Sequence, residues 1–239
     1  MSSLATFATL GITVDASLAL PAWTQLAAVG VGAVSGAAYA ARRGFDVVGV
    51  MLLAVAEGLG GLLLRDTLLQ TGTSIVLIDN RYLLLAAAAA VVGFFFAGLI
   101  DRLEPLVIVL DALALGFLCT VGASVALGEQ LSWIAAIFIG TVTAVGGVTL
   151  RDLLAGEAPR VLRPGVFTAA AAFFGALAFV VLVKAAHLPT GQAQILAMLT
   201  VFAVRLLAVR LQWETRAARD ITDRLWTFWS RDRDKQDHS

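Results

Sequence analysis

The sequence predicts an all-α membrane protein with seven transmembrane helices, built as an inverted 3+3 repeat of helices plus one C-terminal helix. Hydrophobic residues make up 59% of the 239 residues and charged residues only 14%, and the mean hydropathy is +0.89. This composition leaves too little polar surface to cover a soluble globule, so lipid must act as the solvent. Continuous apolar runs without alternation favour helices over a membrane barrel.

Seven apolar segments are long enough to cross a hydrocarbon core about 30 Å thick, which requires about 20 helical residues. Residues 1–20 precede them without the basic region of a secretory signal, and we expect an extramembrane or interfacial segment there. Residues 212–239 alternate charge with tryptophan, and we expect a cytoplasmic amphipathic or disordered tail. The predicted spans are residues 21–41, 47–70, 82–100, 105–127, 131–154, 165–186 and 191–210.

Positive charge is distributed unevenly over the loops. If the loops alternate sides, 14 of the 17 Lys and Arg lie on the side of the C-terminal tail, and only Arg65, Arg81 and Lys184 lie on the other. The positive-inside rule then places the N-terminus outside and the C-terminus in the cytoplasm of a cell inner membrane, which requires an odd number of spans. The formal net charge is zero, and no nucleic acid partner is expected.

A seven-residue pattern, Gly-Gly-x-x-x-Arg-Asp, occurs twice in the chain, and Pro21 and Pro105 open corresponding spans. A three-helix unit has therefore been copied, and because three is odd, the two copies face opposite ways across the membrane. We expect repeat 1 over residues 21–104, the inverted repeat 2 over residues 105–190, and the seventh span over residues 191–211. The pattern comprises Gly60, Gly61, Arg65 and Asp66 in repeat 1, and Gly146, Gly147, Arg151 and Asp152 in repeat 2.

Each copy of the pattern lies on the middle helix of its repeat. Residues four apart share a helix face, so Glu57 extends the first polar stripe and Thr143 extends the second. A helical glycine costs about 1 kcal/mol relative to alanine, and a charge near the bilayer centre costs about 2.5–3.5 kcal/mol. We therefore expect each helix to be broken at its glycine pair, with carbonyl oxygens turned toward a shared hydrated axis. Such oxygens suit a passing hard cation.

Other roles are open for the same residues. Paired glycines also let helices pack closely, and an Arg-Asp pair at a helix end also serves as an interfacial anchor. Adjacent residues do not face each other on a helix, so each Arg and Asp is expected to pair with another span. Asp111 is a candidate for attracting cations at the inner mouth, or an interfacial residue. Lys184 is a candidate for gating, or a snorkelling anchor.

The composition offers no material for a catalytic centre or a metal site. The chain has two histidines and one cysteine, Cys119, so no disulfide and no multi-cysteine metal cluster can form within it. No Ser/His/Asp set, Walker loop or pair of catalytic carboxylates can be assembled from its scattered acids. We therefore predict that the protein is not an enzyme and has no cofactor.

The doubled pattern, the seven predicted spans, the inverted repeat and the outside N-terminus together resemble the prokaryotic branch of the trimeric intracellular cation (TRIC) channel family over roughly residues 20–210. The resemblance implies a homotrimer in the lipid bilayer, with one pore per protomer that conducts monovalent cations, potassium or sodium. It implies pore roles for both copies of the pattern. No Thr-Val-Gly-Tyr-Gly filter is present, so sharp discrimination of potassium from sodium is not expected.

Two other functions are compatible with the same sequence. A secondary transporter of a small solute such as an amino acid, like the related domains labelled glycine transporters, uses inverted repeats and broken helices as well. A membrane scaffold without flux is the third alternative, and it would tolerate larger residues at the glycine pairs.

Overall fold

The computed structural model describes residues 18, 20–95, 104–162 and 168–210. Within these residues the chain folds into helices and contains no strand. The predicted tail, residues 212–239, and nearly all of the predicted N-terminal segment, residues 1–20, lie outside this part of the chain. The all-α fold class predicted from the sequence is confirmed.

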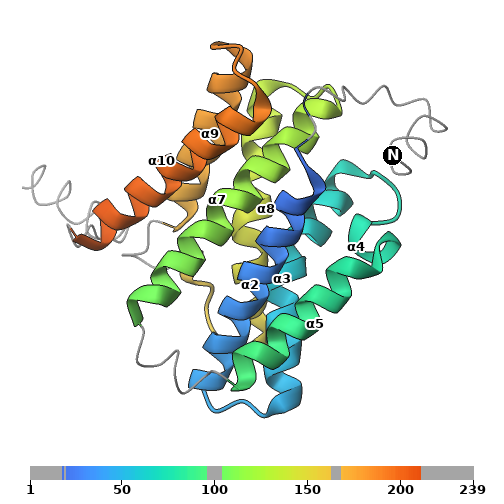
Figure 1. The fold of residues 1–239 in the computed structure, drawn as a ribbon, viewed down its shortest axis with the longest axis vertical. Helices are drawn as coiled ribbons and strands as arrows, with labels where there is room; N and C mark the ends of the chain where they lie inside the picture. The colour runs from blue at the N-terminus through green and yellow to red at the C-terminus, as the bar shows by residue number, and fades with distance from the viewer. Residues whose placement is uncertain (1–17, 19, 96–103, 163–167, 211–239) are drawn as a thin grey trace, which may run out of the picture.

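Seven helices of 16 or more residues form the described bundle, and each begins within three residues of a predicted span (Figure 1). Four regions are long and apolar enough to cross a membrane by length and composition alone, namely α3, α8 and most of α7 and α10. The protein is therefore a multi-pass membrane protein. The helices are α2 (Ala22–Arg42), α3 (Val47–Leu69), α5 (Asn80–Phe95), α7 (Glu104–Gly128), α8 (Trp133–Leu154), α9 (Thr168–Lys184) and α10 (Thr190–Arg210).

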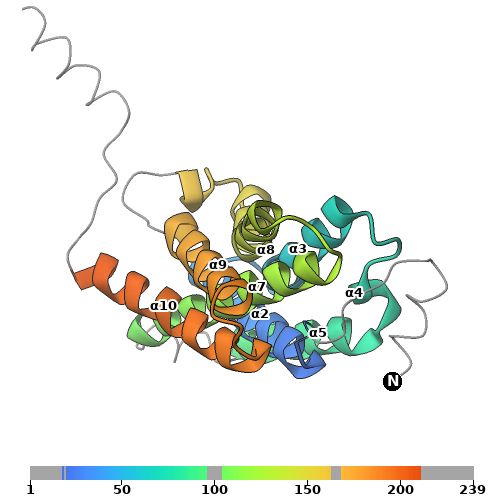
Figure 2. The ribbon, with the colours of Figure 1, turned by 90° about the horizontal axis from the view of Figure 1, so that it is seen from above.

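The first three long helices and the next three form two units of opposite orientation. In Figure 1, α2 runs from top to bottom, whereas α7, its counterpart in the second unit, runs from bottom to top. The two units meet where α3 packs along α8 and α2 packs along α7. The seventh long helix, α10, packs against α7 and α9 at one edge of the molecule (Figure 2). The predicted inverted repeat is confirmed.

Equivalent side chains begin the two middle helices. The Asp46 side chain accepts a hydrogen bond from the backbone N–H of Gly49 at 2.8 Å, and this cap begins α3. Ser132, 86 residues later, accepts one from the backbone N–H of Ala135 at 3.2 Å and begins α8. Each cap satisfies one of the donors that a helix start leaves unpaired. The two repeats therefore share their local structure as well as their fold.

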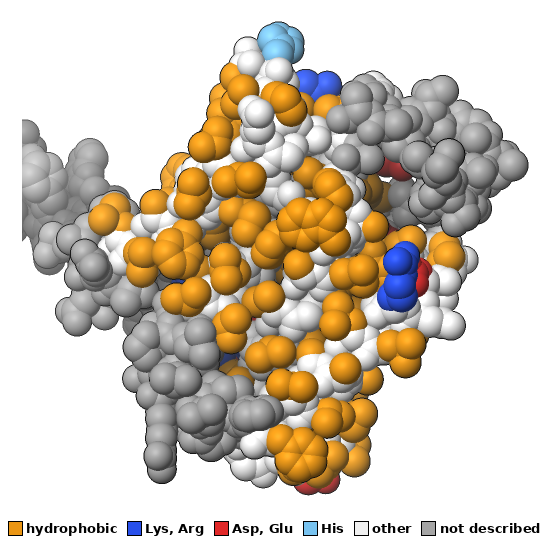
Figure 3. Space-filling view, viewed as in Figure 1, with side chains coloured by type: hydrophobic (Ala, Val, Ile, Leu, Met, Phe, Trp, Pro, Cys, Tyr) orange, Lys and Arg blue, Asp and Glu red, His pale blue; other side chains and the backbone are white. Residues whose placement is uncertain are grey.

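Apolar side chains spread over the face of the bundle seen in Figure 3. Val48 is 72% exposed and Phe95 is 76% exposed, which suits contact with lipid rather than water. The interior is rich in alanine instead, and Ala28, Ala33 and Ala37 of α2 are fully buried. Small residues bring helix backbones together in a membrane, where the hydrophobic effect does not drive helices to associate.

Neither middle helix is broken at its glycine pair, which corrects the prediction of broken helices. Both α3 and α8 are continuous, and the four glycines of the two patterns are buried. A β-carbon added to Gly61 would overlap the carbonyl oxygen of Thr143, and one added to Gly147 would overlap that of Glu57. These carbonyl oxygens therefore face glycines of the opposite repeat. The glycine pairs allow close packing of α3 on α8, the alternative role that the sequence left open.

Candidate functional site

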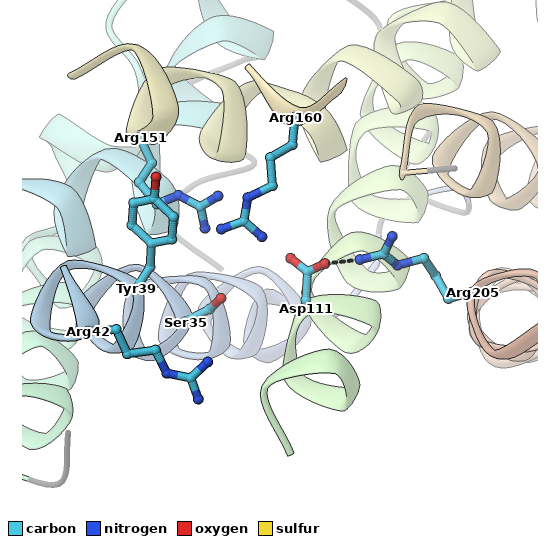
Figure 4. A pocket seen from close by; sticks show the side chains of 7 residues that line it. All are labelled: Ser35, Tyr39, Arg42, Asp111, Arg151, Arg160 and Arg205. Carbon is cyan, nitrogen blue, oxygen red and sulfur yellow. Dashed lines mark hydrogen bonds and ion pairs between the residues drawn. The ribbon is translucent and has the colours of Figure 1, made fainter. Parts of the chain in front are cut away.

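A polar cavity of about 120 Å³ lies at the end of the bundle where α2 and α8 finish (Figure 4). The loop charges assign this end to the side predicted to be cytoplasmic. Both repeats, the short helix η2 (Arg160–Leu162) and α10 contribute side chains to its wall. The lining residues are Ser35, Tyr39 and Arg42 of α2, Asp111 of α7, Arg151 of α8, Arg160 of η2 and Arg205 of α10.

Arg151 connects this cavity to the centre of the bundle. Its Nη1 donates to Glu57 Oε2 at 2.7 Å, while Nη2 and Nε donate to Asp152 Oδ1 at 2.6 and 3.1 Å. The guanidinium also lies over the ring of Tyr39, 4.0 Å from its centroid. The side chain of Arg151 is 1% exposed, so only these paired charges and the ring compensate its loss of water.

The two carboxylate oxygens of Glu57 are bonded unequally. Its Oε2 binds Arg151, whereas its buried Oε1 accepts no hydrogen bond within the described part of the chain. The hydroxyl of Tyr39 is likewise buried and has no partner there. A buried carboxylate oxygen without a donor is costly, and it is the kind of group that attracts a cation or water.

Arg65 is the counterpart of Arg151 at the opposite end of the bundle. It donates from Nε to Asp66 Oδ1 at 2.7 Å, and from Nη1 to Gln25 Oε1 at a longer 3.5 Å. The position equivalent to Glu57 is Thr143, whose hydroxyl donates to the carbonyl oxygen of Ile139 in its own helix at 2.6 Å. Arg65 therefore receives no carboxylate from the other repeat.

The prediction that each Arg and Asp would pair with another span is confirmed for Arg151, which binds Glu57, but it is wrong in holding that the adjacent Arg and Asp do not pair with each other. In both repeats the guanidinium folds back and binds the neighbouring aspartate, and Arg151 alone also pairs with a carboxylate from another long helix, Glu57 of α3. The prediction used the direction of the Cα–Cβ bonds, but the long arginine stem brings the planar head back along the helix.

The aspartate of each pattern also fixes the loop that follows its helix. Asp66 Oδ2 accepts from Ser74 Oγ at 2.5 Å and from Ile75 N at 3.1 Å. Asp152 Oδ2 accepts from Arg160 N at 2.8 Å. These bonds hold two short elements that the sequence did not predict, α4 (Ile75–Ile78) and η2, over the ends of α3 and α8. Both aspartates are thus structural anchors of the loops as well as partners of arginine.

Two further candidates from the sequence have different surroundings. Asp111 lines the cavity and pairs with Arg205 of α10, whose Nη1 also donates to Thr168 Oγ1 at 3.0 Å. Lys184 is exposed and ends α9, whereas Thr168 begins that helix. Lys184 therefore lies at the far end of α9 from the cavity.

Sequence reasoning did not select Gln25, Tyr39, Arg160 or Arg205. The repeat could have identified Gln25, because this residue lies 86 residues before Asp111, at the equivalent position of repeat 1. The sequence could also have identified Arg205, because a charged residue inside a predicted span is a functional candidate in a membrane protein. Nothing in the sequence pattern distinguishes Tyr39 or Arg160, because their roles depend on helices that meet only in the fold.

A separate ion pair joins Asp79, which follows α4, to Arg81 in the first turn of α5. Arg81 donates from Nε and Nη2 to Asp79 Oδ2 at 2.9 and 2.6 Å. These hydrogen bonds hold the pKa of Asp79 below its usual value. The Asp79 carboxylate therefore stays ionised at neutral pH at the end of the bundle that holds Arg65.

Sequence comparison detects the same duplication as the structure. The profile of a family described as "Glycine transporter" matches residues 22–98 and again residues 108–184. A UPF0126 membrane protein of Deinococcus radiodurans is 34% identical over 194 residues, covering 80% of this chain and 88% of that protein. The UPF0126 inner membrane protein YadS of Escherichia coli K12 is 28% identical, covering 79% and 91%.

Solved structures share the fold over most of their length. The TRIC trimeric intracellular cation channel orthologue from Rhodobacter sphaeroides superposes with a TM-score of 0.73 at 32% identity, covering 78% of this chain and 96% of that one. The chain belongs to the prokaryotic TRIC-like family. A second TRIC structure, solved to explain conductance through TRIC cation channels, gives a TM-score of 0.73 at 29% identity, covering 81% and 95%. In this TRIC-like chain the glycines of both copies of the Gly-Gly-x-x-x-Arg-Asp pattern lie at the contact between the repeats, where α3 packs along α8.

Proposed function

We propose that the protein is a channel for monovalent cations, permeable to potassium, with one conduction path through the interior of each protomer. The observation that carries the proposal is the series of buried polar side chains along the contact between the repeats. It begins at Arg65 and Asp66, continues through Thr143 and Glu57, and reaches the arginine-lined cavity. Buried charge is costly in a membrane, so its presence along one route supports a hydrated function there.

In this proposal the described conformation is a closed one. The glycines of α3 and α8 touch the opposite backbone, and Arg151 binds Glu57, the carboxylate that the described residues place at the middle of the series. A cation can use both Glu57 oxygens only after the guanidinium moves away from Oε2. Arg151 would then keep its two bonds to Asp152, so its charge would not be left without a partner.

The proposal includes the assembly and the location of the channel. Exposed apolar residues on several helices support contact with lipid and with further copies of the chain, and we propose a homotrimer in the inner membrane, as the TRIC neighbours suggest. The loop charges support an N-terminus outside and a cytoplasmic C-terminus, which places the cavity on the cytoplasmic side. Transport rather than catalysis is proposed, with no cofactor besides the permeant potassium or sodium ions.

Single-channel recording of the purified full chain in planar bilayers tests the proposal. A channel gives discrete ohmic openings whose reversal potential moves toward the potassium equilibrium potential under a potassium chloride gradient. Protein-free bilayers are the control, and crosslinking of the same preparation reports the number of subunits. Silent bilayers with correctly folded protein would contradict the proposal.

The description of the matching family profile favours a second candidate, a carrier for glycine. A carrier would bind its solute between the repeats and alternate between two conformations. Proteoliposomes containing the protein would then take up radiolabelled glycine with saturation and with dependence on an ion gradient, and would give no unitary currents. Unitary currents without uptake would exclude this candidate.

A further inference from the structure

The outermost helix of the bundle sends one charged side chain inward. α10 carries mostly exposed apolar residues such as Ile195 and Leu199, which are 61% and 59% exposed. Arg205 of the same helix instead points into the cavity wall, where its side chain is only 11% exposed (Figure 4). It pairs with Asp111 of α7 and donates to Thr168 of α9. The helix outside the 3+3 repeat thus contributes directly to the polar interior.

The other repeat does not use a charge at the same place. The residue equivalent to Asp111 is Gln25, a neutral side chain that contacts Arg65 of its own repeat. Asp111 forms no ion pair with Arg151 and takes its partner from α10. A neutral residue at position 111 would not need a cation on α10. The Asp111–Arg205 pair is therefore an addition to the repeat, and packing alone does not require it.

The charge of the cavity depends on this pair. Four arginines and Asp111 line the wall, and the carboxylates of Glu57 and Asp152 bind Arg151 at its inner end. Removing the charge of Arg205 would make this wall more negative by one charge, whereas removing that of Asp111 would make it more positive by one charge. Charges lining a low-dielectric cleft change the local concentration of small ions.

We propose that Arg205 and Asp111 set the electrostatic potential of the inner mouth, and thereby the rate at which cations enter the path from this side. The proposal rests on the proposed channel function and names two residues that tune it. Asp111 raises the local cation concentration and Arg205 lowers it, so the two residues act in opposite directions. Their pairing makes these two charges offset each other.

Unitary potassium conductance of the full-length protein in symmetric salt tests this inference. At about 0.1 M salt, where the Debye length is about 10 Å, Arg205→Gln should raise the conductance about twofold and Asp111→Asn should lower it about twofold. The double variant should return to the wild-type value. At about 1 M salt all four proteins should converge, because the Debye length falls to about 3 Å.

Two controls separate electrostatics from folding. Arg205→Lys keeps the charge and should conduct like the wild type. Lys184→Gln removes one positive charge at the far end of α9, and it should not reproduce the increase given by Arg205→Gln. Damage to the fold would shift both single variants in the same direction, and that result would overturn the inference. Wild-type openings with unchanged single variants would also overturn it and would leave the channel function standing, whereas a wild type without openings would contradict the channel function itself.

Discussion

Repeat 1 and repeat 2 contain the same seven-residue pattern but surround its arginine differently. Arg151 binds a carboxylate of the opposite repeat, Glu57. Thr143 stands at the position equivalent to Glu57, and among the described residues Arg65 donates to Asp66 and to the more distant Gln25. The local Arg-Asp bond is common to both repeats, so it belongs to the architecture. Of the two arginines, only Arg151 binds a carboxylate from the opposite repeat in the part of the chain that the structure describes, namely Glu57. We therefore infer that this carboxylate serves the function of the end that holds Arg151.

This difference makes the two ends of a duplicated fold chemically unequal. Two identical halves in opposite orientation would present the same groups to both sides of the membrane. Here the end with Arg151 has the cavity, Glu57 and the Asp111–Arg205 pair, while at the end with Arg65 the aspartate of the pattern binds Ser74. We expect substitutions at shared features to act alike in the two repeats, and substitutions at the unequal features to act differently.

The largest effect common to both repeats is expected at the glycines that they share. Gly61→Ala and Gly147→Ala each place a methyl group against a backbone carbonyl of the opposite helix, which cannot move without separating α3 from α8. Each should lower stability by about 3 kcal/mol, near the upper end for overpacking. Gly30→Ala on α2 is the matched control, because its new β-carbon would meet Leu85 at an ordinary 3.6 Å. Thermal unfolding in detergent measures all three, and equal melting temperatures for the three variants would contradict the close contact.

An effect that differs between the two repeats is expected at the arginines. Arg151→Gln leaves Glu57 buried without its cation, at a cost of about 3–5 kcal/mol. Arg65→Gln should cost less, because Asp66 keeps its bonds from Ser74 and the backbone of Ile75. Adding Glu57→Gln to Arg151→Gln should recover part of the loss. Melting temperatures rank the variants, and an Arg65 variant as unstable as the Arg151 variant would remove the proposed difference between the repeats.

The smallest effect is expected at the loop anchor of repeat 1. Ser74→Ala removes the 2.5 Å hydrogen bond to Asp66 but keeps the backbone bond from Ile75, so a loss of about 1–2 kcal/mol is expected. Thr67→Val is the control, since its hydroxyl bonds only to Leu63 of its own helix. Hydrogen exchange over residues 70–78 should rise in the Ser74 variant alone. Unchanged exchange would mean that the bond from the backbone N–H of Ile75 is enough to hold the loop on Asp66. The loop after α8 is held on Asp152 by a backbone N–H in the same way, that of Arg160.

The fold was more predictable from the sequence than the site was. Apolar segments about 20 residues long identify membrane helices because the bilayer fixes their length, and the copied pattern identifies the repeat. The glycine pairs were misjudged because their cost was assigned to each helix alone, whereas the contact between Gly61 and Thr143 exists only when α3 meets α8. The partners of Arg151 and Asp111 lie 94 residues away in the chain, beyond the reach of any local rule.

The central claim is that cations pass through the interior of each protomer by way of Glu57. The most direct test is the reversal potential of Glu57→Gln compared with the wild type, measured in planar bilayers under a potassium chloride gradient. The variant keeps the shape of the side chain and removes its charge, so its reversal potential should move from the potassium equilibrium potential toward zero. A folded variant that conducts with the wild-type reversal potential would contradict the account.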